Sequence, residues 1–383
     1  MDGGIQILER ILKREKMKDI KKIRDKNIIF LPFLLLLIFL GISYPEKIGN
    51  YPHFVEWETI AALTGLLIIT TSIKESGYFH AVAVRILEKM GNERKLALFL
   101  LFLSCTLSPF LTNDVALFIV VPLTIGLADM MKKDVGKMVI FEAMAVNVGS
   151  LLTPIGNPQN LFLWHEWGIS FSKFVITMLP LFLLLLLLLI IFLITVFPPN
   201  KIDFYGKGSE VKYRKKMFIS SIILLTAYIA CLQFGKGYYA LFFIFLIYLA
   251  FFREIFARID WLLIILFVIM FIDFRLITEI NTLHTFMNNF GMEKSSTTFI
   301  LSLLTSQITS NVPASIFISQ FSHQWFSISY GVNVGGNGFV IASLANIIAL
   351  RFVGGRKIWL QFHKYSVPYF IITAIMAYLI FFR

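Results

Sequence analysis

The sequence is poor in charged residues and in cysteine. Only 15% of its 383 residues are charged, whereas 57% are hydrophobic and the mean hydropathy is +0.78. This composition excludes a soluble domain with a single anchor and predicts an all-α polytopic membrane protein. The two cysteines, Cys105 and Cys231, lie in apolar stretches, so no disulfide framework is expected.

The sequence also lacks a Gly-rich phosphate loop of the GxxxxGK[ST] type, which argues against ATP hydrolysis by this chain. Its net charge of +12 comes from Lys and Arg residues that lie mostly between apolar runs. Positive charge in inner loops explains this pattern better than nucleic-acid binding. We therefore expect a lipid bilayer, and no nucleic acid, as a partner.

Two apolar segments are broken by helix-disrupting residues. In Val146–Leu163, Pro154 and Pro158 each remove a backbone donor, and Gly156 loosens the helix between them. Broken backbone at membrane depth survives only inside protein or against a watery cavity. A second such segment is Gly331–Asn346. Two broken segments in corresponding halves of a chain are typical of a transporter binding site.

Two other apolar segments carry polar residues in their middle and are predicted to be re-entrant hairpins. The first, 96–131, has its tip at Pro109–Asp114 and arms of about 14 residues, too short for a 30 Å core. Basic residues at both of its ends predict entry from inside. The second, 296–321, turns at Ser310–Pro313 and lacks such flanks, so entry from outside is expected.

The order of these elements recurs, which predicts an inverted repeat. In both copies a tip asparagine, Asn113 or Asn311, precedes an Asn-Val-Gly motif that begins at Asn147 or Asn333. The fold class is therefore an inverted-repeat secondary transporter with two opposed re-entrant hairpins and two broken transmembrane helices. Such hairpins, meeting near the midplane, would bring Asn113 and Asn311 together.

The predicted organisation has five parts. They are a cytoplasmic or surface segment 1–26; a first repeat 27–198, with hairpin 96–131 and broken helix 137–171; a cytoplasmic linker 199–216; an inverting helix 217–235; and a second, inverted repeat 236–383, with hairpin 296–321 and broken helix 322–352. The apolar run 28–42 is expected to be a retained first helix rather than a cleaved signal. Loop charges predict a cytoplasmic N-terminus and an outer C-terminus in the cytoplasmic (inner) membrane.

These motifs resemble the ion transporter superfamily, which includes sodium-coupled citrate and dicarboxylate transporters, arsenite permeases and sodium/proton antiporters. The resemblance covers about residues 57–382 and rests on Thr112-Asn113-Asp114 with Val121-Pro122, Asn147-Val148-Gly149-Ser150, Thr153-Pro154-Ile155-Gly156-Asn157-Pro158-Gln159-Asn160, Ser310-Asn311-Val312-Pro313 and Asn333-Val334-Gly335-Gly336-Asn337. In the carboxylate members both tips read Ser-Asn-Thr and bind sodium and substrate. Here the third position is Asp114 or Val312, and an Asn-Asp pair looks more like the arsenite permeases.

The resemblance and the polar pattern together give one candidate substrate and ion site. Its expected residues are Thr112, Asn113, Asp114, Asn147, Gly149, Ser150, Thr153, Gly156, Asn157, Ser310, Asn311, Val312, Asn333, Gly335, Gly336 and Asn337. The resemblance implies sodium sites at Asn113, Asp114, Thr153 and Asn157 and at Asn311, Gly335 and Asn337. The expected coupling ion is sodium or a proton, no covalent cofactor is expected, and a homodimer remains open.

The charged residues inside apolar segments allow more than one interpretation. A carboxylate at membrane depth costs about 2.5–3.5 kcal/mol, so Asp114 is interpreted as a sodium ligand or proton carrier, or as a cap of the following arm. Arg275 is expected to pair with Glu279 on one helix face, or else to attract an anion. Glu142 is expected at the inner interface.

The leading function is secondary transport of a small anion, either a carboxylate or an inorganic oxyanion, coupled to sodium or protons. Arsenite-type oxyacid efflux and sodium/proton antiport remain alternatives. An intramembrane enzyme using Asp114 and Asp273 is a distant one, because neither has the Gly-x-Gly-Asp context of intramembrane aspartyl proteases. A channel is disfavoured because selectivity filters usually arise from symmetric rings of subunits.

Overall fold

The structure is a computed structural model that describes residues 30–79, 81, 91–131, 134–202, 213–280, 287 and 290–383, except the side chains of 126–130. Within these ranges no strand is formed, and five helices are long and apolar enough to cross a membrane. A sixth span results if the pair Phe30–Ser43 and Pro45–Phe54, bent by 116°, is counted as one. The all-α polytopic class is therefore confirmed. The segment 1–26, the extension of the second span to Lys89 and most of the linker 199–216 lie outside the described residues.

The named helices follow the predicted order. They are η1 (Pro45–Asn50), α2 (Tyr51–Phe54), α3 (Trp57–Glu75), α5 (Glu93–Leu111), α6 (Asn113–Met131), α7 (Gly136–Ser150), α8 (Pro158–Glu166), α9 (Phe171–Val196), α10 (Lys215–Gln233), α11 (Gly237–Phe251), η2 (Arg253–Ala257), α12 (Trp261–Thr278), α14 (Ser295–Thr309), α15 (Asn311–Ser319), α16 (Trp325–Gly335), η3 (Val340–Ala342), α17 (Leu344–Val353) and α18 (Lys357–Phe381).

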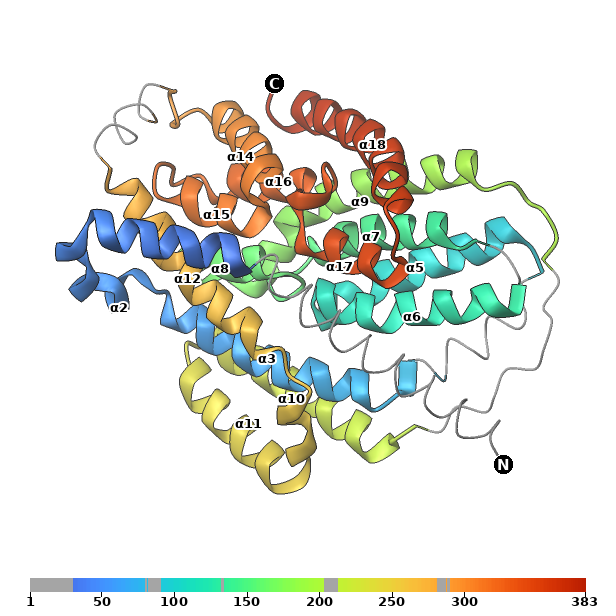
Figure 1. The fold of residues 1–383 in the computed structure, drawn as a ribbon, viewed down its shortest axis with the longest axis horizontal. Coiled ribbons are helices and arrows are strands. Elements are labelled where there is room, and N and C mark those ends of the chain that lie inside the picture. Colours follow the sequence, from blue (N-terminus) through green and yellow to red (C-terminus); the bar gives the residue numbers. More distant parts are fainter. Residues whose placement is uncertain are drawn as a thin grey trace, which may run out of the picture. The chain divides into compact units, whose positions relative to one another are not determined.

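The predicted length of the arms of the first hairpin was wrong. The arms α5 and α6 have 19 residues each, so each is about 28 Å long and nearly spans a bilayer core. The short-arm argument for the first hairpin therefore fails, although α5 and α6 do form a hairpin that turns at one residue, Thr112 (Figure 1). Helix α3 ends at Glu75, shortly before Gly77, which adopts φ +73°. Helix α18 begins at Lys357, directly after Arg356, and has 25 residues.

The described chain forms two compact units. The smaller unit comprises residues 30–55 and 260–280, and the larger comprises 56–259 with the described part of 281–383. In the smaller unit the ring centroids of Phe33 and Phe274 lie 6.3 Å apart. Glu279, expected to pair with Arg275, has Lys47 Nζ 2.7 Å from its Oε2.

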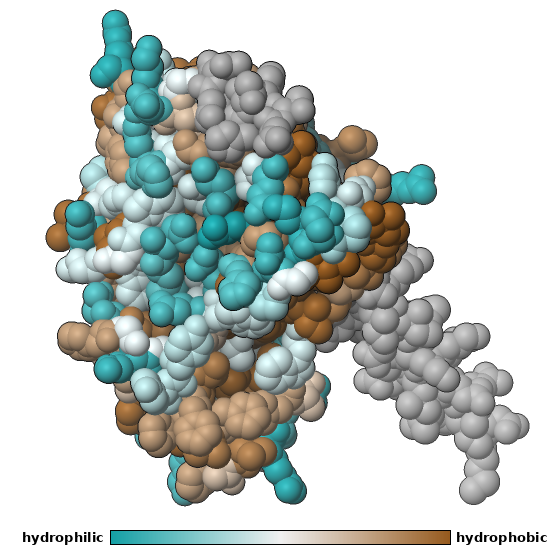
Figure 2. Space-filling view, turned by 90° about the vertical axis from the view of Figure 1, so that its left-hand side faces the viewer, coloured by the Kyte–Doolittle hydropathy of each residue, from teal (hydrophilic) through white to brown (hydrophobic). Residues whose placement is uncertain are grey.

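In the larger unit, α9 shows how the sequence sets burial. It is an unbroken, Leu-rich helix of 26 residues. Its buried residues recur every three or four positions: Phe174, Met178, Leu181, Leu185, Leu189 and Leu193. One stripe therefore packs on protein while the other faces expose large apolar side chains, as expected of a lipid-facing helix. Figure 2 shows hydrophilic side chains beside large hydrophobic ones on one face of the molecule.

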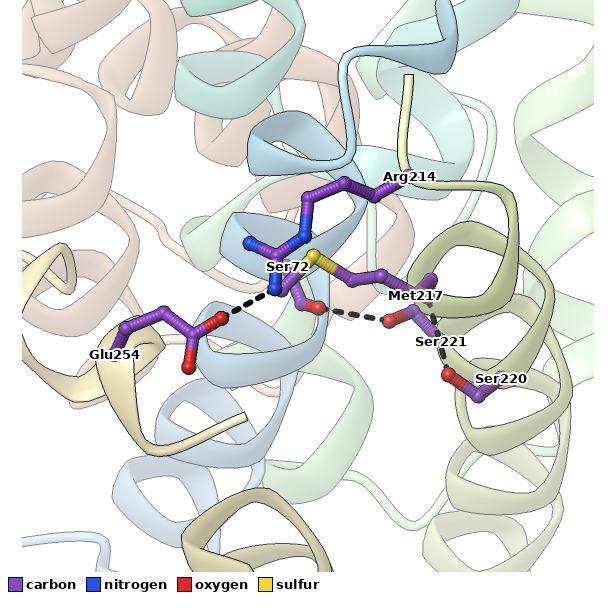
Figure 3. A network of polar contacts seen from close by, with 6 residues as sticks. All are labelled: Ser72, Arg214, Met217, Ser220, Ser221 and Glu254. Carbon is purple, nitrogen blue, oxygen red and sulfur yellow. Dashed lines mark hydrogen bonds and ion pairs between the residues drawn. The ribbon is translucent and has the colours of Figure 1, made fainter. Parts of the chain in front are cut away.

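Helices α3, α10 and α11 are joined by buried hydroxyl groups. The Ser221 hydroxyl donates to Ser72 Oγ at 2.9 Å (Figure 3). It also lies 2.7 Å from the Tyr248 hydroxyl, so α10 is tied to both neighbours. Tyr228 packs against Gly65, where a Cβ would lie 2.6 Å from a ring carbon, and donates to Ala61 O at 2.9 Å. These contacts fix the three helices as one packed group.

Candidate substrate and ion site

The first broken helix is capped by its own polar residues. Helix α7 ends at Ser150 and α8 begins at Pro158, with Asn157 Oδ1 accepting from Asn160 N at 2.9 Å. The Asn160 side-chain amide donates to the carbonyls of Ser150, Leu151 and Thr153 at 3.2–3.4 Å. The carbonyls that the break releases from the helical ladder therefore gain side-chain donors.

The tip of the first hairpin is docked on this break. Asn113 N donates to Gly156 O at 2.8 Å, and Thr153 Oγ1 donates to Pro109 O at 2.5 Å. Gly149 lies so close to α5 that a Cβ there would be 2.8 Å from the Cα of Cys105. The predicted placement of a broken helix beside the first tip is confirmed.

The second hairpin is docked on the second break in the same way. Gln307 Nε2 donates to Gly335 O at 2.8 Å, while its Oε1 accepts from Phe339 N at 2.9 Å. Asn311 Nδ2 lies 3.2 Å from where a Cβ would stand at Gly336. Figure 1 shows the two hairpins, α5–α6 and α14–α15, approaching from opposite sides. The described hydrogen bonds include none between Asn113 and Asn311.

Both tips carry a strained residue. Thr112 has φ +65° and ψ 149°, and Ser310 has φ +84° and ψ 158°. In the part of the chain that the structure describes, no other non-glycine residue has positive φ. This backbone region is nearly restricted to glycine and costs about 1–3 kcal/mol per residue, so it persists only where the surroundings enforce it. Strain of this kind is concentrated at ligand clamps and active sites.

The two broken helices are locked to each other by a reciprocal exchange of hydrogen bonds. Asn147 Nδ2 donates to Asn346 Oδ1 at 2.8 Å, and Ser343 Oγ donates to Asn147 Oδ1 at 3.0 Å. In the reverse direction, Asn333 Nδ2 donates to Asn160 Oδ1 at 2.7 Å, and Asn157 Nδ2 donates to Asn333 Oδ1 at 3.1 Å. Each asparagine therefore binds the start of the second half-helix in the opposite break.

This exchange obeys the internal repeat. The three residues of one set match those of the other at a constant offset of 186 positions (333 − 147, 343 − 157, 346 − 160). Ser343 and Asn346 were not predicted from the sequence as site residues. Asn160 was included in the family motif but not among the site residues. Aligning the two breaks on their Asn-Val-Gly motifs would have found all three, because each of these positions in one copy has a polar residue in the other.

Every predicted polar residue of the site is buried. The exposed fraction is 7% for Thr112, 4% for Asn113, 8% for Asp114, 4% for Asn147, 1% for Ser150, 5% for Thr153, 1% for Asn157, 7% for Ser310, 3% for Asn311, 2% for Asn333 and 0% for Asn337. Val312, the apolar residue of the second tip, is also buried, with 2% of its side chain exposed. The described conformation therefore holds both tips away from bulk solvent.

Some buried oxygen atoms near the breaks form no hydrogen bond among the described residues. They are Ser108 Oγ, beside Gly149, Gln159 Oε1 and Asn337 Oδ1. Hydroxyl and amide oxygens are the ligands that hard cations prefer. These atoms are donors of the kind that a hard cation takes, whereas the described residues include no group of three His, Cys, Asp or Glu side chains that could hold a metal ion.

Glu142, which the sequence suggested to lie at the inner interface, is buried in protein within α7, with 1% of its side chain exposed. The sequence did not show this burial, because the burial and the rotation of this part of α7 depend on how α5, α6 and α17 pack around it. Hydropathy alone does not report either quantity.

Comparison with known proteins agrees with this architecture. A family model described as "Citrate transporter" matches residues 17–324. The inner membrane protein YbiR of Escherichia coli is 35% identical over 349 residues, covering 91% of this chain and 94% of that protein. The uncharacterized transporter MJ0456 of Methanocaldococcus jannaschii is 35% identical over 334 residues, covering 86% of this chain and 90% of that protein.

A shorter match joins the chain to a human protein. The P protein of Homo sapiens is 30% identical over 143 residues, which cover 34% of this chain and 17% of that protein. The family model and the two nearly full-length relatives carry the assignment: the chain is a multi-pass membrane transporter that belongs to the citrate transporter family of the ion transporter superfamily.

Proposed function

We propose that this chain is a secondary active transporter that moves a small anion, either a carboxylate or an inorganic oxyanion, together with sodium or protons. The observation that carries the proposal is the reciprocal lock of the two breaks, in which Asn147 bonds Asn346 and Asn333 bonds Asn160, with a strained hairpin tip docked on each break. Two hairpins, each with its own broken helix, arranged around one site are typical of transporters that work by alternating access. In this proposal the repeats 27–198 and 236–383 move around that centre in the cytoplasmic membrane, with the N-terminus inside and the C-terminus outside.

The proposed binding chemistry follows from the charge of the site. The predicted site residues include one carboxylate, Asp114, and no Lys or Arg. An anion therefore needs a bound cation beside it, since Asp114 alone would repel it. Sodium held by Asn113, Asp114, Thr153 and Asn157, and by Asn311, Gly335 and Asn337, would supply this charge. The N-terminal end of α8 adds a partial positive charge.

Asp114 also supports a second candidate. Its counterpart in the other hairpin is Val312, so the two tips are chemically unequal (312 − 114 and 311 − 113 both give 198). A single carboxylate at one tip suits a proton carrier. Proton-driven oxyacid efflux of the arsenite type and sodium/proton exchange are therefore the alternatives.

Sodium binding tests the proposal first. The purified protein would be unfolded thermally in sodium chloride and in choline chloride at equal ionic strength. A ligand present at 100 times its dissociation constant stabilises the folded state by about 2.7 kcal/mol. We expect sodium-specific stabilisation that Asn113→Ala abolishes and that the exposed control Asn50→Ala retains. Equal sodium stabilisation in Asn113→Ala would contradict the assigned site.

Transport itself would be measured in proteoliposomes. Uptake of labelled citrate and of arsenite would be compared under a sodium gradient and under a pH gradient, with a pH-sensitive dye reporting sodium/proton exchange in the absence of either anion. We expect Asn113→Ala and Asn311→Ala each to reduce flux strongly. Unchanged transport in both variants would contradict the proposal.

A further inference from the structure

Glu142 is a buried carboxylic group outside the site described above. It lies on α7, five residues before Asn147, and so about 7.5 Å along the helix axis from the reciprocal lock. The Thr124 hydroxyl on α6 donates to its Oε1. Its Oε2 is buried and has no hydrogen-bond partner among the described residues.

The internal repeat shows that the fold does not require an acid at this position. The offset of 186 positions that relates Asn147 to Asn333 relates Glu142 to Ile328 (328 − 142). Ile328 is 0% exposed, so an apolar side chain fills the equivalent place in α16. A carboxyl group in a membrane-spanning segment is costly and normally has a function. Its presence in only one of two equivalent helices indicates a role beyond packing.

The surroundings of Glu142 offer little to stabilise a negative charge. Helices α5, α6, α9, α17 and α18 pack against α7. The titratable and charged groups on these helices include Arg94 and Cys105 of α5, Asp114 of α6, Arg351 of α17 and Tyr365 and Tyr369 of α18, while Lys173 of α9 is exposed. Arg94 donates through Nε to Phe197 O at 2.8 Å, and the Tyr369 hydroxyl donates to Leu185 O at 2.7 Å. Lys137, on α7 itself, lies over the Phe197 ring. None of these groups forms a salt bridge with Glu142 in the described structure.

Arg351 is the cation to consider, because it lies near the depth of Glu142. Asn346 of α17 accepts a hydrogen bond from Asn147 of α7, so these two residues lie side by side. Glu142 lies five residues before Asn147, and Arg351 lies five residues after Asn346. The start of α7 lies beside the chain that follows α17, because a Cβ at Gly136 would be 2.9 Å from Ile358 Cδ1, so Glu142 and Arg351 lie on the same side of the Asn147–Asn346 contact. Arg351 is nonetheless only half-buried, whereas Glu142 is almost fully buried.

These observations decide which form of Glu142 suits the described conformation. An ionised carboxylate would leave a charged oxygen buried without a partner, which costs far more than burying a neutral polar group. The protonated form leaves only a neutral hydroxyl in that place, while Oε1 still accepts from Thr124. We propose that Glu142 is a proton-binding site that holds its proton while α6 and α7 are packed as seen here and releases it when rearrangement of the first hairpin admits water to Oε2.

The coupling role of this proton rests on the proposed transport function, but the binding of the proton does not. Thr124 belongs to the arm that begins at the first tip, so movement of α6 would carry both Asn113 and Thr124. A proton held here and a cation held at the tip would therefore respond to the same movement. Proton binding can be measured on purified protein without any substrate.

The test is the infrared spectrum of the full-length protein in lipid, recorded as pH is raised. A protonated carboxylic acid gives a carbonyl stretching band distinct from the amide bands. We expect a band that titrates with pH in the wild type, is lost in Glu142→Gln and is retained in the control Glu93→Gln, which removes a carboxylate at the start of α5. Thr124→Val should shift the band to higher frequency without removing it, because the carbonyl loses its donor.

Three outcomes would overturn the inference. Identical wild-type and Glu142→Gln spectra would mean that Glu142 is ionised throughout, as it would be if Arg351 neutralised it. A Glu142 band that never titrates would make it a permanently neutral packing group. If Glu142→Gln does not fold, the test rests on Thr124→Val, and an unshifted carbonyl band in that variant would contradict the inference. A titrating band in a protein that transports nothing would refute the proposed function and leave the proton site intact.

Discussion

The reciprocal lock gives the sharpest prediction, which is the cost of Asn147→Ala. Asn147 donates to Gly336 O at 3.0 Å and to Asn346 Oδ1 at 2.8 Å, and it accepts from Ser343 Oγ. Gly336 O keeps a second donor, Asn346 Nδ2 at 2.9 Å. Two buried groups, Ser343 Oγ and Asn346 Oδ1, therefore lose their partner. At about 1–3 kcal/mol for each stranded group, the variant should lose about 2–6 kcal/mol of unfolding free energy.

A double-mutant cycle isolates the lock from other effects. Ser343→Ala alone strands only Asn147 Oδ1 and should cost about 1–3 kcal/mol. In the double variant that group no longer exists, so the combined cost should fall short of the sum by about 0.5–3 kcal/mol. The control is Ser315→Ala, whose buried hydroxyl bonds only Val312 O of its own helix.

The assay is reversible unfolding in mixed micelles, followed by circular dichroism. Additivity of Asn147→Ala and Ser343→Ala within about 0.3 kcal/mol would refute the reasoning, since independent sites add within that range. Equal losses in Ser343→Ala and Ser315→Ala would also refute it. In that case truncation of any buried hydroxyl would explain the cost.

Two further predictions concern strain and surface charge. Thr112→Gly and Ser310→Gly should each stabilise the fold by about 1 kcal/mol, because relief of about 1–3 kcal/mol of backbone strain exceeds the entropy that glycine adds to the unfolded chain; an unchanged melting temperature would contradict this. Arg214 lowers the pKa of Glu254 in the folded protein, chiefly through a side-chain hydrogen bond. This exposed pair should therefore stabilise the protein at pH values above the ordinary glutamate pKa of about 4.3. The stabilisation should be lost as pH falls through the lowered pKa of the folded state. Arg214→Gln should cost less than about 1 kcal/mol at neutral pH and flatten this dependence, and a larger loss would show that the pair is more than a surface contact.

The sequence by itself determined the fold class and the positions of both tips and both breaks. Pro154, Gly156 and Pro158 interrupt a helix through their own backbone chemistry, whatever lies around them. A run of polar residues inside an apolar segment likewise requires burial in protein, because lipid offers no hydrogen bonds. Both are local rules, so the sequence is sufficient to apply them. The ion and substrate roles of these residues remain predictions.

Only the tertiary structure decided which residues these polar groups meet. Asn147 bonds Ser343 and Asn346, which are 196 and 199 residues away, because two broken helices cross at that point. The burial of Glu142 depends on the rotation of α7 against its neighbours, and the contact of Glu279 with Lys47 depends on the path of η1. Helix crossing, rotation and chain path arise from the packing of the whole chain, and no local pattern encodes them.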